Sequence, residues 1–332
     1  MKVISPSVEV WSVDSTDPIA VMKHIERAGR VCYKSEERIT DNSCEKFIES
    51  VIDRGHTAVL EHGSLIVYAG GDAESYIHRL REAVHFEQFM RLTHVVDPAR
   101  KLYKGIYVSG NIRAWREVIE TGLKGNLWIP SALEAILGQY GLLFEDLLNI
   151  NRYNKPGWER SVYDPFECHV VNQRNLHPFE RMTHAAYTVK FVCDRGVTHE
   201  IVRHRLASYC QESTRYCNYS KGKFDGELTF IKPCFFRGEK SAKYVTWMNA
   251  MKLAEQYYFD LLNFGATPQE ARTVLPNSLK AELVMTARAD EWLWFFKLRT
   301  AEAAHPQMQE VAKMAKGLLF CTDPDVFGVD VQ

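Results

Sequence analysis

Two short segments with a strand-like pattern of apolar side chains, far apart in the chain, constrain the fold most. In "GHTAVLEHGSLIVYAGG" the alternating residues are Leu65, Val67 and Ala69, and in "AYTVKFVCDRG" they are Tyr187, Val189, Phe191 and Cys193. A period of two is typical of a strand with one buried face, so we expect two strands of one sheet with residues 71–184 inserted between them. The Pro- and Asn-containing stretch "NKPGWERSVYDP" favours a different division, in which a separate first domain ends between residues 150 and 185.

Helical patterns occupy most of the remaining chain. Apolar residues recur every three or four positions in segments that begin near residues 18, 43, 132, 244 and 268. The segments "SLKAELVMTA", "DEWLWFFKLR" and "PQMQEVAKMAKGLLF" predict three more helices towards the end of the chain. The expected fold class is therefore α+β with helices dominant, the insertion is expected to be mostly helical, and no internal repeat is evident.

Composition narrows the classes of function. The 332 residues suffice for one large domain or two ordinary ones, and 46% apolar with 25% charged residues is typical of a globular protein. The formal net charge of −1 gives no overall attraction to nucleic acid or to an anionic membrane, so a site for anions must be a local concentration of arginines. No apolar run approaches the length of a membrane span, and "MKVISPSVEV" lacks the apolar core of a signal peptide. We expect neither a nucleic-acid partner nor a membrane contact.

The eight cysteines include no C-x-x-C pair and show no regular spacing. Structural zinc sites commonly take their cysteine ligands from such pairs, so no metal site is expected. The pattern indicates reduced thiols in a cytoplasmic protein.

Positive charge is concentrated locally in "VRHRLASYCQESTRYCNY", residues 202–219. Arg203, His204 and Arg205 are consecutive, and Arg215 follows a stretch of hydroxyl and amide side chains. Thr198 can cap a helix that carries the triplet, and on a helix Arg203 and Arg205 would face nearly opposite ways. They would then serve two anionic ligands, or one ligand that a neighbouring subunit also holds. The backbone N–H groups of "QESTR" could line a phosphate.

Two interpretations of this charge stay open on spacing alone. One is a meeting of two phosphorylated ligands, such as a nucleotide and a phosphate-bearing cofactor. The other is a solvated face with surface salt bridges, which are common and contribute little stability.

The order Arg-His-Arg, seven residues, Ser213 resembles the signature of the flavin-dependent thymidylate synthases, the ThyX family. Five further segments resemble family segments in the family's order: "RGHTAVLEH", "DRGVTHEIVRHR", "STRYCNYSKGKF", "ATPQEARTVLPNSLKAELVMTA" and "FFKLRTAEAAHPQ". The resemblance covers residues 1–70 and about 185–320. The chain thus resembles a long variant, with a catalytic domain of residues 1–70 and 185–332 and an insertion of residues 71–184.

The resemblance implies a helix-rich domain with a central antiparallel sheet, assembled as a homotetramer that binds FAD and dUMP where subunits meet. It implies reductive methylation of dUMP to dTMP, with methylenetetrahydrofolate as carbon donor and NADPH as reductant. The hydride comes from reduced flavin, which is the chemistry of the cofactor. No enzymic cysteine attacks the uracil ring in this family, so Cys210 is not expected to be a nucleophile.

The same resemblance assigns the site residues. Those at dUMP are Glu200, Arg203, Gln211, Glu212, Ser213, Thr214, Arg215, Arg272 and Arg299. Those at FAD are His56, His204, Arg205, Leu206, Glu212 and His305. Arg299 and Ser213 are the expected catalytic residues. A guanidinium suits the role of Arg299, because it stays cationic and can stabilise negative charge on the pyrimidine carbonyl.

Each assignment has an ordinary structural alternative. Arg272 and Arg299 could simply pair with Glu270 or Glu302. For His56 and His305 the alternative is structural, because a single histidine in a helix-rich core is commonly just hydrogen-bonded.

Three departures from the family pattern bear on FAD. Residues 288–290 are Arg-Ala-Asp where many members have Asn-x-Arg, Trp294 stands where many have His or Asn, and Ala58 stands where many have Ser or Thr. Inside the insertion, "SGNIRAWRE" contains the missing pattern in Asn111 and Arg113. As a hypothesis, this segment supplies a substitute contact to the flavin.

Three other functions compete with a thymidylate synthase. A related enzyme that releases a hydroxymethyl pyrimidine nucleotide would need the same residues, because the outcome depends on water access and pocket shape. A non-catalytic nucleotide- or RNA-binding descendant is disfavoured by the retained serine and arginines and by the lack of an aromatic-and-basic stripe. A structural oligomer with a silent site is the third.

Overall fold

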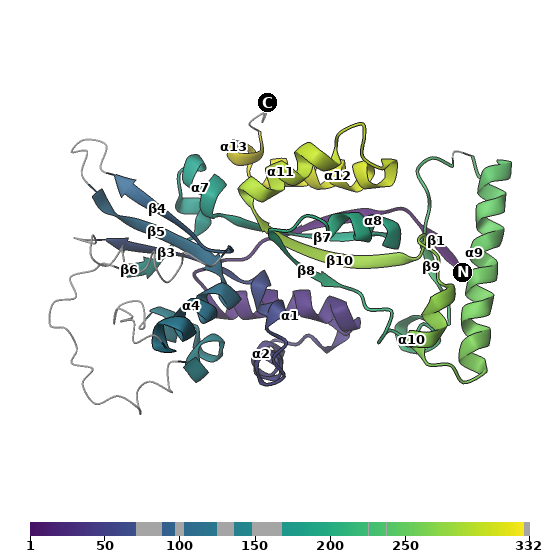
Figure 1. Ribbon diagram of the computed structural model, residues 1–332, viewed down its shortest axis with the longest axis horizontal. Coiled ribbons are helices and arrows are strands. Elements are labelled where there is room, and N and C mark those ends of the chain that lie inside the picture. The colour runs from purple at the N-terminus through teal and green to yellow at the C-terminus, as the bar shows by residue number, and fades with distance from the viewer. Residues whose placement is uncertain are drawn as a thin grey trace.

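The fold is built on two four-stranded antiparallel sheets, which lie one after the other along an elongated molecule (Figure 1). The computed structural model describes residues 1–70, 88–96, 103–124, 136–147, 168–224, 226–236 and 238–328. The central sheet contains, in spatial order, β2 (Ser7–Trp11), β7 (Ala186–Asp194), β10 (Lys280–Arg288) and β8 (Ala207–Gln211). The second sheet contains β4 (Arg91–Val96), β5 (Tyr103–Asn111), β3 (Ser64–Gly70) and β6 (Cys168–Val170). A short parallel pair joins β1 (Lys2–Ile4) to β9 (Thr229–Ile231).

Helices cover both faces of the central sheet (Figure 1). One face carries α1 (Pro18–Tyr33), η2 (Thr57–His62) and, behind them, α2 (Ser43–Asp53); the other carries α7 (Pro178–His184), α8 (Arg195–Ile201), α11 (Ala289–Arg299), α12 (Pro306–Thr322) and α13 (Pro324–Phe327). The second sheet leads into α4 (Ile112–Lys124), while α9 (Ala242–Asn263) and α10 (Pro268–Ala271) lie beyond β1 and β9. The short 3₁₀ turns are η1 (Glu36–Arg38), η3 (Gly141–Leu143), η4 (Gln173–Asn175), η5 (Gly222–Phe224) and η6 (Arg272–Val274). None of the helices described is long and apolar enough to cross a membrane.

The prediction of a helix in "SLKAELVMTA" is wrong, because this segment forms β10 in the middle of the central sheet. Leu283 and Met285 pack against α11 and α12, while Val284 packs against α1 on the other face. Since both faces are covered, the strand has no alternation of apolar and polar residues. A short, fully buried strand cannot be distinguished from a buried helix by periodicity.

The two predicted strands form as β3 and β7, but the expectation that they share one sheet is wrong. β3 pairs with β5 and β6, which come from residues 71–184, whereas β7 pairs with β2 and β10. The α+β class with a central antiparallel sheet is confirmed, and the described part of 71–184 contributes strands as well as α4 and α7. The division into catalytic domain and insertion stays a prediction. The start of the helix expected near residue 132, and the stretch "NKPGWERSVYDP", lie outside the described residues.

The two sheets share one strand order, a repeat that is not evident in the sequence. The orders are β4-β5-β3-β6 and β8-β10-β7-β2. Ser64 at the start of β3 pairs with Asn111 at the end of β5, just as Ala186 pairs with Arg288 in the other sheet. A helix follows each of these strand ends, and its fourth residue is a fully buried tryptophan, Trp115 in α4 and Trp292 in α11. We call the segment from η2 to α4 unit 1 and the segment from α7 to α11 unit 2.

The units exchange equivalent hydrogen bonds. His62 Nδ1 lies 2.8 Å from Thr286 Oγ1, and His184 Nδ1 lies 2.7 Å from Ser109 Oγ. Each histidine stands two residues before its own strand, and each hydroxyl stands two residues before the end of the other unit's strand. Such a reciprocal contact is what a two-fold relation between the units produces.

Stability should fall as the pH drops from 7 to 5. Burial lowers the pKa of His24 and His184 to about 4 and that of His62 to about 3. An unfolded histidine titrates near 6.5, so in this window the unfolded chain takes up protons that the folded chain does not. The loss is about 2 kcal/mol of unfolding free energy per histidine at pH 5 relative to pH 7.

Urea unfolding at pH 7, 6 and 5 measures this loss. The variant that combines His62→Gln with His184→Gln should show a shallower dependence on pH, because two of these three strongly shifted histidines are gone. His199→Gln, at an exposed position, is the control and should keep the wild-type slope. Equal slopes for all three proteins would contradict the prediction.

Candidate functional site

α8 begins and ends earlier than predicted. Asp194, not Thr198, caps the helix by accepting a hydrogen bond of 2.9 Å from a backbone N–H of its first turn. The helix ends at Ile201, and residues 203–205 lie in the loop that leads to β8. The helical placement of the triplet is therefore wrong, and with it the inference that two arginines point to opposite sides of a helix. The physical reason is that β8 begins at Ala207 and needs extended backbone immediately after the triplet.

The three residues of the triplet have different environments. Arg203 and Arg205 are exposed, whereas His204 is 7% exposed. His204 Nε2 lies 3.1 Å from Glu291 Oε2, and the ring meets the Phe295 ring edge-on at 5.7 Å. Burial lowers the pKa of His204, and a nearby arginine lowers it further. The imidazole is therefore neutral at pH 7.

Arg299 is held beside Glu200 at the end of α11. Its Nη2 donates to the backbone oxygen of Glu200 at 2.9 Å, and its Nη1 lies 4.0 Å from Glu200 Oε2. The Tyr209 hydroxyl of β8 donates to the carbonyl oxygens of Ile201 at 3.1 Å and of His204 at 2.5 Å. These contacts bring the ends of α8 and α11 and the start of β8 together.

Glu212 anchors the loop that follows β8. Its side chain is almost fully buried, with Oε2 2.9 Å from Lys280 Nζ and Oε1 accepting from the Tyr219 hydroxyl at 3.1 Å. Lys280 also contacts Glu282 at 2.8 Å, and Glu282 in turn contacts Lys34 at 2.7 Å. These lysines outweigh the effect of burial and lower the pKa of Glu282. A buried network of charges therefore sets the position of the loop.

The remaining predicted dUMP residues lie around this anchor. Gln211 Nε2 donates to a hydroxyl of α8 at 2.9 Å, which ties the loop to that helix. The Ser213 hydroxyl oxygen accepts a hydrogen bond from the backbone N–H of Arg215 at 3.3 Å. Arg272 Nη1 lies 3.5 Å from Thr214 Oγ1. The structure thus brings the 211–215 loop, Arg272 and the end of α8 into one region.

The alternative of ordinary surface ion pairs does not describe these arginines. Glu270 accepts from Thr267 instead of pairing with Arg272, and Arg299 contacts Glu200 instead of Glu302. Among the arginines assigned to the site, Arg203, Arg205, Arg215 and Arg272 form no ion pair with a described residue. Exposed cations without a carboxylate partner are suited to bind an anionic ligand.

Two predicted flavin residues lie away from this region. His56 is exposed at the start of η2, on the face of the central sheet opposite to α8. His305 is exposed just before α12, and its ring meets Phe235 edge-on at 5.9 Å. A single chain does not bring these two histidines together.

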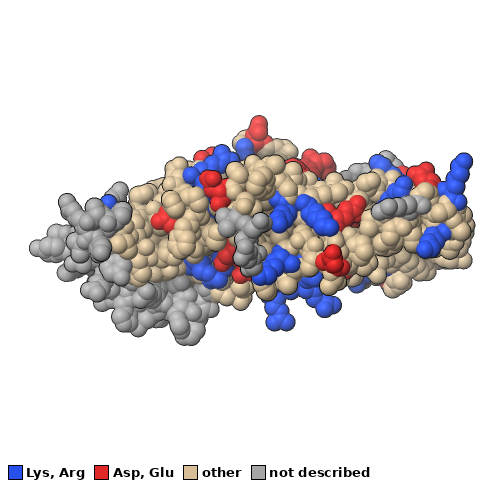
Figure 2. All heavy atoms as spheres, turned by 90° about the horizontal axis from the view of Figure 1, so that it is seen from above, with Lys and Arg blue, Asp and Glu red and all other residues tan. Residues whose placement is uncertain are grey.

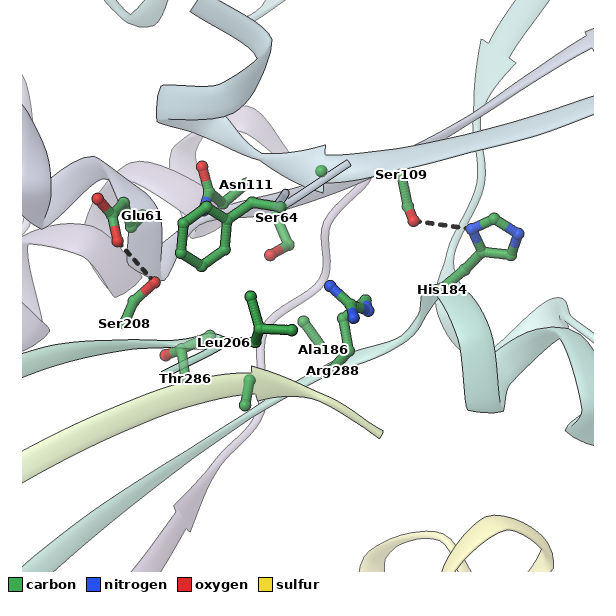
Figure 3. Close-up of a pocket in the computed structure, with 13 residues that line it drawn as sticks. Glu61, Ser64, Ser109, Asn111, His184, Ala186, Leu206, Ser208, Thr286 and Arg288 are labelled. Atoms are coloured by element: carbon green, nitrogen blue, oxygen red, sulfur yellow. Dashed lines mark hydrogen bonds between the residues drawn. The ribbon is translucent and has the colours of Figure 1, made fainter. Parts of the chain in front are cut away.

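A small hollow, partly open to solvent, lies between the two sheets (Figure 3). Ser208 donates to Glu61 Oε2 at 2.9 Å at one side of it, and Arg113 donates to Glu61 Oε1 at 2.8 Å. Asn111 and Arg288, from the equivalent strand ends of the two units, also line it. The hollow therefore joins the segment "GHTAVLEH", the insertion and the residues after the triplet.

The residues that depart from the family pattern differ in how far they are buried. Arg288 is 8% exposed, and its Nε lies 3.2 Å from Asp290 Oδ1. Ala58 and Trp294 are exposed. Trp294 is 51% exposed, and Lys297 Nζ lies over its ring, 5.9 Å from the ring centroid.

Several contributing residues were not predicted from the sequence. The triplet and the loop are positioned by Tyr209, Glu291 and Lys280. Each of these contacts joins residues that are distant in sequence or lie in different elements, so no local pattern predicts it. Glu61 belongs to a segment that the sequence singles out, yet no sequence signal points to its contact with Ser208.

The surface over α11–α13 mixes charges of both signs. On the described part of the face in Figure 2, lysine and arginine side chains are interspersed with aspartate and glutamate and form no continuous stripe. Binding along a nucleic-acid backbone requires such a stripe. The concentrated cations are instead those of the loops around α8.

The protein has an α+β fold in which exposed arginines gather beside the central sheet. Residues 165–324 match the family model described as "Thymidylate synthase complementing protein", Thy1. The family prediction made from the sequence is confirmed.

Similar proteins include the flavin-dependent thymidylate synthases of Pyrococcus abyssi (34% identical over 163 residues, 49% of this chain and 66% of that protein) and Geobacter sulfurreducens (30% over 147 residues, 44% and 61%). The matched region thus spans slightly less than two thirds of these relatives' lengths. A solved structure, the UMP/dUMP methylase PolB from Streptomyces cacaoi bound with 5-Br dUMP, aligns over 99% of this chain and 96% of its own with 16% identity and a TM-score of 0.40.

Proposed function

We propose that this protein is a flavin-dependent thymidylate synthase. It would methylate dUMP reductively to dTMP, with methylenetetrahydrofolate as carbon donor, NADPH as reductant and FAD as cofactor. The observation that carries the proposal is that the family match, residues 165–324, contains the whole cluster of Glu200, Arg299 and the 211–215 loop. Relatives of this chain from Pyrococcus abyssi and Pyrococcus furiosus are named flavin-dependent thymidylate synthases.

In this proposal the cluster binds dUMP. The exposed guanidinium groups of Arg203, Arg215 and Arg272 are available to the phosphate. Ser213 lies in the same loop and would contact the uracil or the phosphate. Arg299 would stabilise negative charge on the uracil carbonyl, and its bond to Glu200 already holds it in place, so little reorganisation is needed on binding.

The residues around the triplet are compatible with FAD. Arg205 is an exposed cation, and Leu206 lines the hollow beside it. His204 is buried against Glu291 and Phe295. Its main role would therefore be to position this loop, and it would make little direct contact with the ligand. When bound, FAD supplies the hydride that completes the methyl group. The chain's own residues bind and orient the two nucleotides.

The homotetramer belongs to the same proposal. Exposed His56 and His305 lie apart in one chain, and assembly with shared sites would allow each to meet a flavin across a subunit boundary. A cytoplasmic location is likewise proposed, consistent with the free cysteines of the described chain. The mass of the assembly in solution tests the first of these points.

The test is the visible spectrum of the purified protein after FAD addition and removal of unbound cofactor. We expect a retained flavin band, followed by a product from dUMP whose mass is that of dTMP. A hydroxymethyl product would identify the related hydroxymethyltransferase. A colourless protein that still binds dUMP would overturn the enzymatic proposal in favour of a nucleotide-binding descendant.

A further inference from the structure

The last turn of α1 is tied to the loop of the candidate site. Helix α1 ends at Tyr33, and the last carbonyl oxygens of a helix find no partner within the helix. One of them, the oxygen of Cys32, accepts a hydrogen bond of 3.0 Å from the backbone N–H of Ser213. The centroid of the Tyr33 ring lies 5.4 Å from that of the Tyr216 ring. The end of this helix therefore helps to set where the 211–215 loop lies.

Two thiols meet where this helix packs against β8. The Cys32 and Cys210 side chains are hydrogen-bonded to each other, and the Cys32 sulfur also accepts from the backbone N–H of Gln211. Cys210 is 3% exposed among apolar neighbours, whereas Cys32 is partly exposed. Both cysteines are free, and the proposed reaction uses neither of them. The pair thus offers one thiol that a small molecule can reach and a second, shielded thiol beside it.

The hydrogen bond makes the two thiols chemically unequal. Donation from Cys210 stabilises the thiolate of Cys32, so the pKa of Cys32 is lowered although burial acts to raise it. The pKa of Cys210 is raised, because the same hydrogen bond and burial keep this thiol protonated. The thiolate is the form that attacks an oxidant, and redox-sensitive cysteines are accessible and close to a resolving thiol. In this pair Cys32 is therefore the nucleophile and Cys210 the resolving thiol.

We infer that hydrogen peroxide converts Cys32 and Cys210 into a reversible disulfide, and that this bond displaces the 211–215 loop. The Cys32 thiolate attacks one peroxide oxygen, the O–O bond breaks, and the departing hydroxide takes up a proton to give water and a Cys32 sulfenic acid. Cys210 then attacks that sulfur, the S–O bond breaks, and a second water leaves with the Cys210 proton. The two thiols lose two electrons and the peroxide gains them. A dithiol reductant reverses the step by thiol–disulfide exchange.

The disulfide would act on the loop through α1. A disulfide holds its two sulfurs about 2.05 Å apart, which is closer than a hydrogen-bonded contact allows. Cys210 is fixed by its register with Val284 in the central sheet, so the last turn of α1 has to move. The Cys32 oxygen moves with it, and we expect Ser213 to lose its hydrogen bond and dUMP to bind more weakly. The effect on dUMP rests on the proposed function, whereas disulfide formation does not.

The experiment treats the full chain with hydrogen peroxide and maps disulfides by mass spectrometry after alkylation of free thiols. We expect an intramolecular disulfide between Cys32 and Cys210 that a dithiol removes. Cys32→Ser and Cys210→Ala should each abolish it, and thermal melting checks that they are folded. Cys32 is partly exposed, so its variant keeps the test valid if Cys210→Ala is unstable. The matched control is Cys321→Ser, at an exposed cysteine of α12, which should form the disulfide as the wild type does.

Two further measurements test the effect on the loop. Calorimetry should show a dUMP affinity about tenfold lower after oxidation, restored by the dithiol. Peroxide should leave the affinity of Cys32→Ser unchanged. Hydrogen exchange at the Ser213 amide should be faster in the oxidised wild type, because its acceptor is displaced. This last readout needs no ligand and does not depend on the proposed function.

Two outcomes overturn the inference. One is that peroxide gives no disulfide between Cys32 and Cys210 in the wild type. The other is that the disulfide forms while dUMP affinity and Ser213 exchange both stay unchanged, because the bond would then not control the loop. If the reduced protein binds no dUMP, the proposed function fails, whereas the disulfide with faster Ser213 exchange would still support the inference.

Discussion

In the proposed reaction, replacing Arg299 by lysine should lower the rate of dTMP formation from dUMP roughly 100- to 1,000-fold while the protein stays folded. The guanidinium uses Nη2 to hold the backbone oxygen of Glu200 at 2.9 Å and still has N–H groups left for a ligand. A lysine has one nitrogen on a flexible stem, so it cannot make the structural bond and present a fixed donor to uracil at the same time. Initial rates with FAD-saturated protein, at several dUMP concentrations, measure the effect on turnover and on KM.

The control for Arg299→Lys is Arg27→Lys. Arg27 pairs with Glu9 at 2.6 Å on an exposed surface, so its replacement should leave turnover within twofold of the wild type. Unchanged melting of both variants would separate catalysis from folding. A loss of less than fivefold in Arg299→Lys would show that this arginine does not act on the reacting ring.

Replacing Lys280 by methionine should lower the free energy of unfolding by about 3 kcal/mol at pH 7. The change leaves Glu212 with no cation: its side chain is 1% exposed, and Lys280 Nζ at 2.9 Å is its only ion-pair partner among the residues described. Burial of an unpaired carboxylate is costly, whereas Glu282 keeps Lys34 and Lys190. Because Glu212 anchors the loop, dUMP affinity should fall together with stability.

Urea unfolding of three variants tests the cause. Lys232→Met removes a lysine that pairs with exposed Glu239 at 3.0 Å, and should cost less than about 0.5 kcal/mol. Adding Glu212→Gln to Lys280→Met should recover about 1 kcal/mol or more, because the uncompensated charge disappears. If the double variant is no more stable than Lys280→Met alone, the buried ion pair is not the source of the loss.

Local patterns predicted the long helices and the isolated strands correctly. α9, α11 and α12, and the strands β3 and β7, occur where periodicity and capping residues placed them. These signals are local, because a helix or a half-buried strand records its own exposed and buried faces in its sequence. β10 was misassigned because helices cover both of its faces. Its sequence therefore lacks the alternation of apolar and polar residues that identifies a half-buried strand.

The candidate site was predicted in part. The family resemblance selected Glu200, Arg299 and the 211–215 loop, and the structure brings them together at the ends of α8 and α11. The orientation of Arg203 and Arg205 was derived from a helix that stops before them. The start of the strand after the triplet depends on pairing with β10, more than 70 residues further along the chain, and no local pattern contains that information.

The amino-acid sequence by itself determined the chemistry available to this protein: the near-zero net charge, the local cluster of arginines and the residues that relate it to one family. Only the tertiary structure decided that residues 71–184 help to build a second sheet, that this sheet repeats the order of the first, and that the two units enclose a hollow lined by Asn111 and Arg288. The physical reason is that strand pairing and buried polar contacts are set by which distant segments meet. Such a contact stabilises the fold only when both segments meet, so the sequence of one segment alone does not predict it.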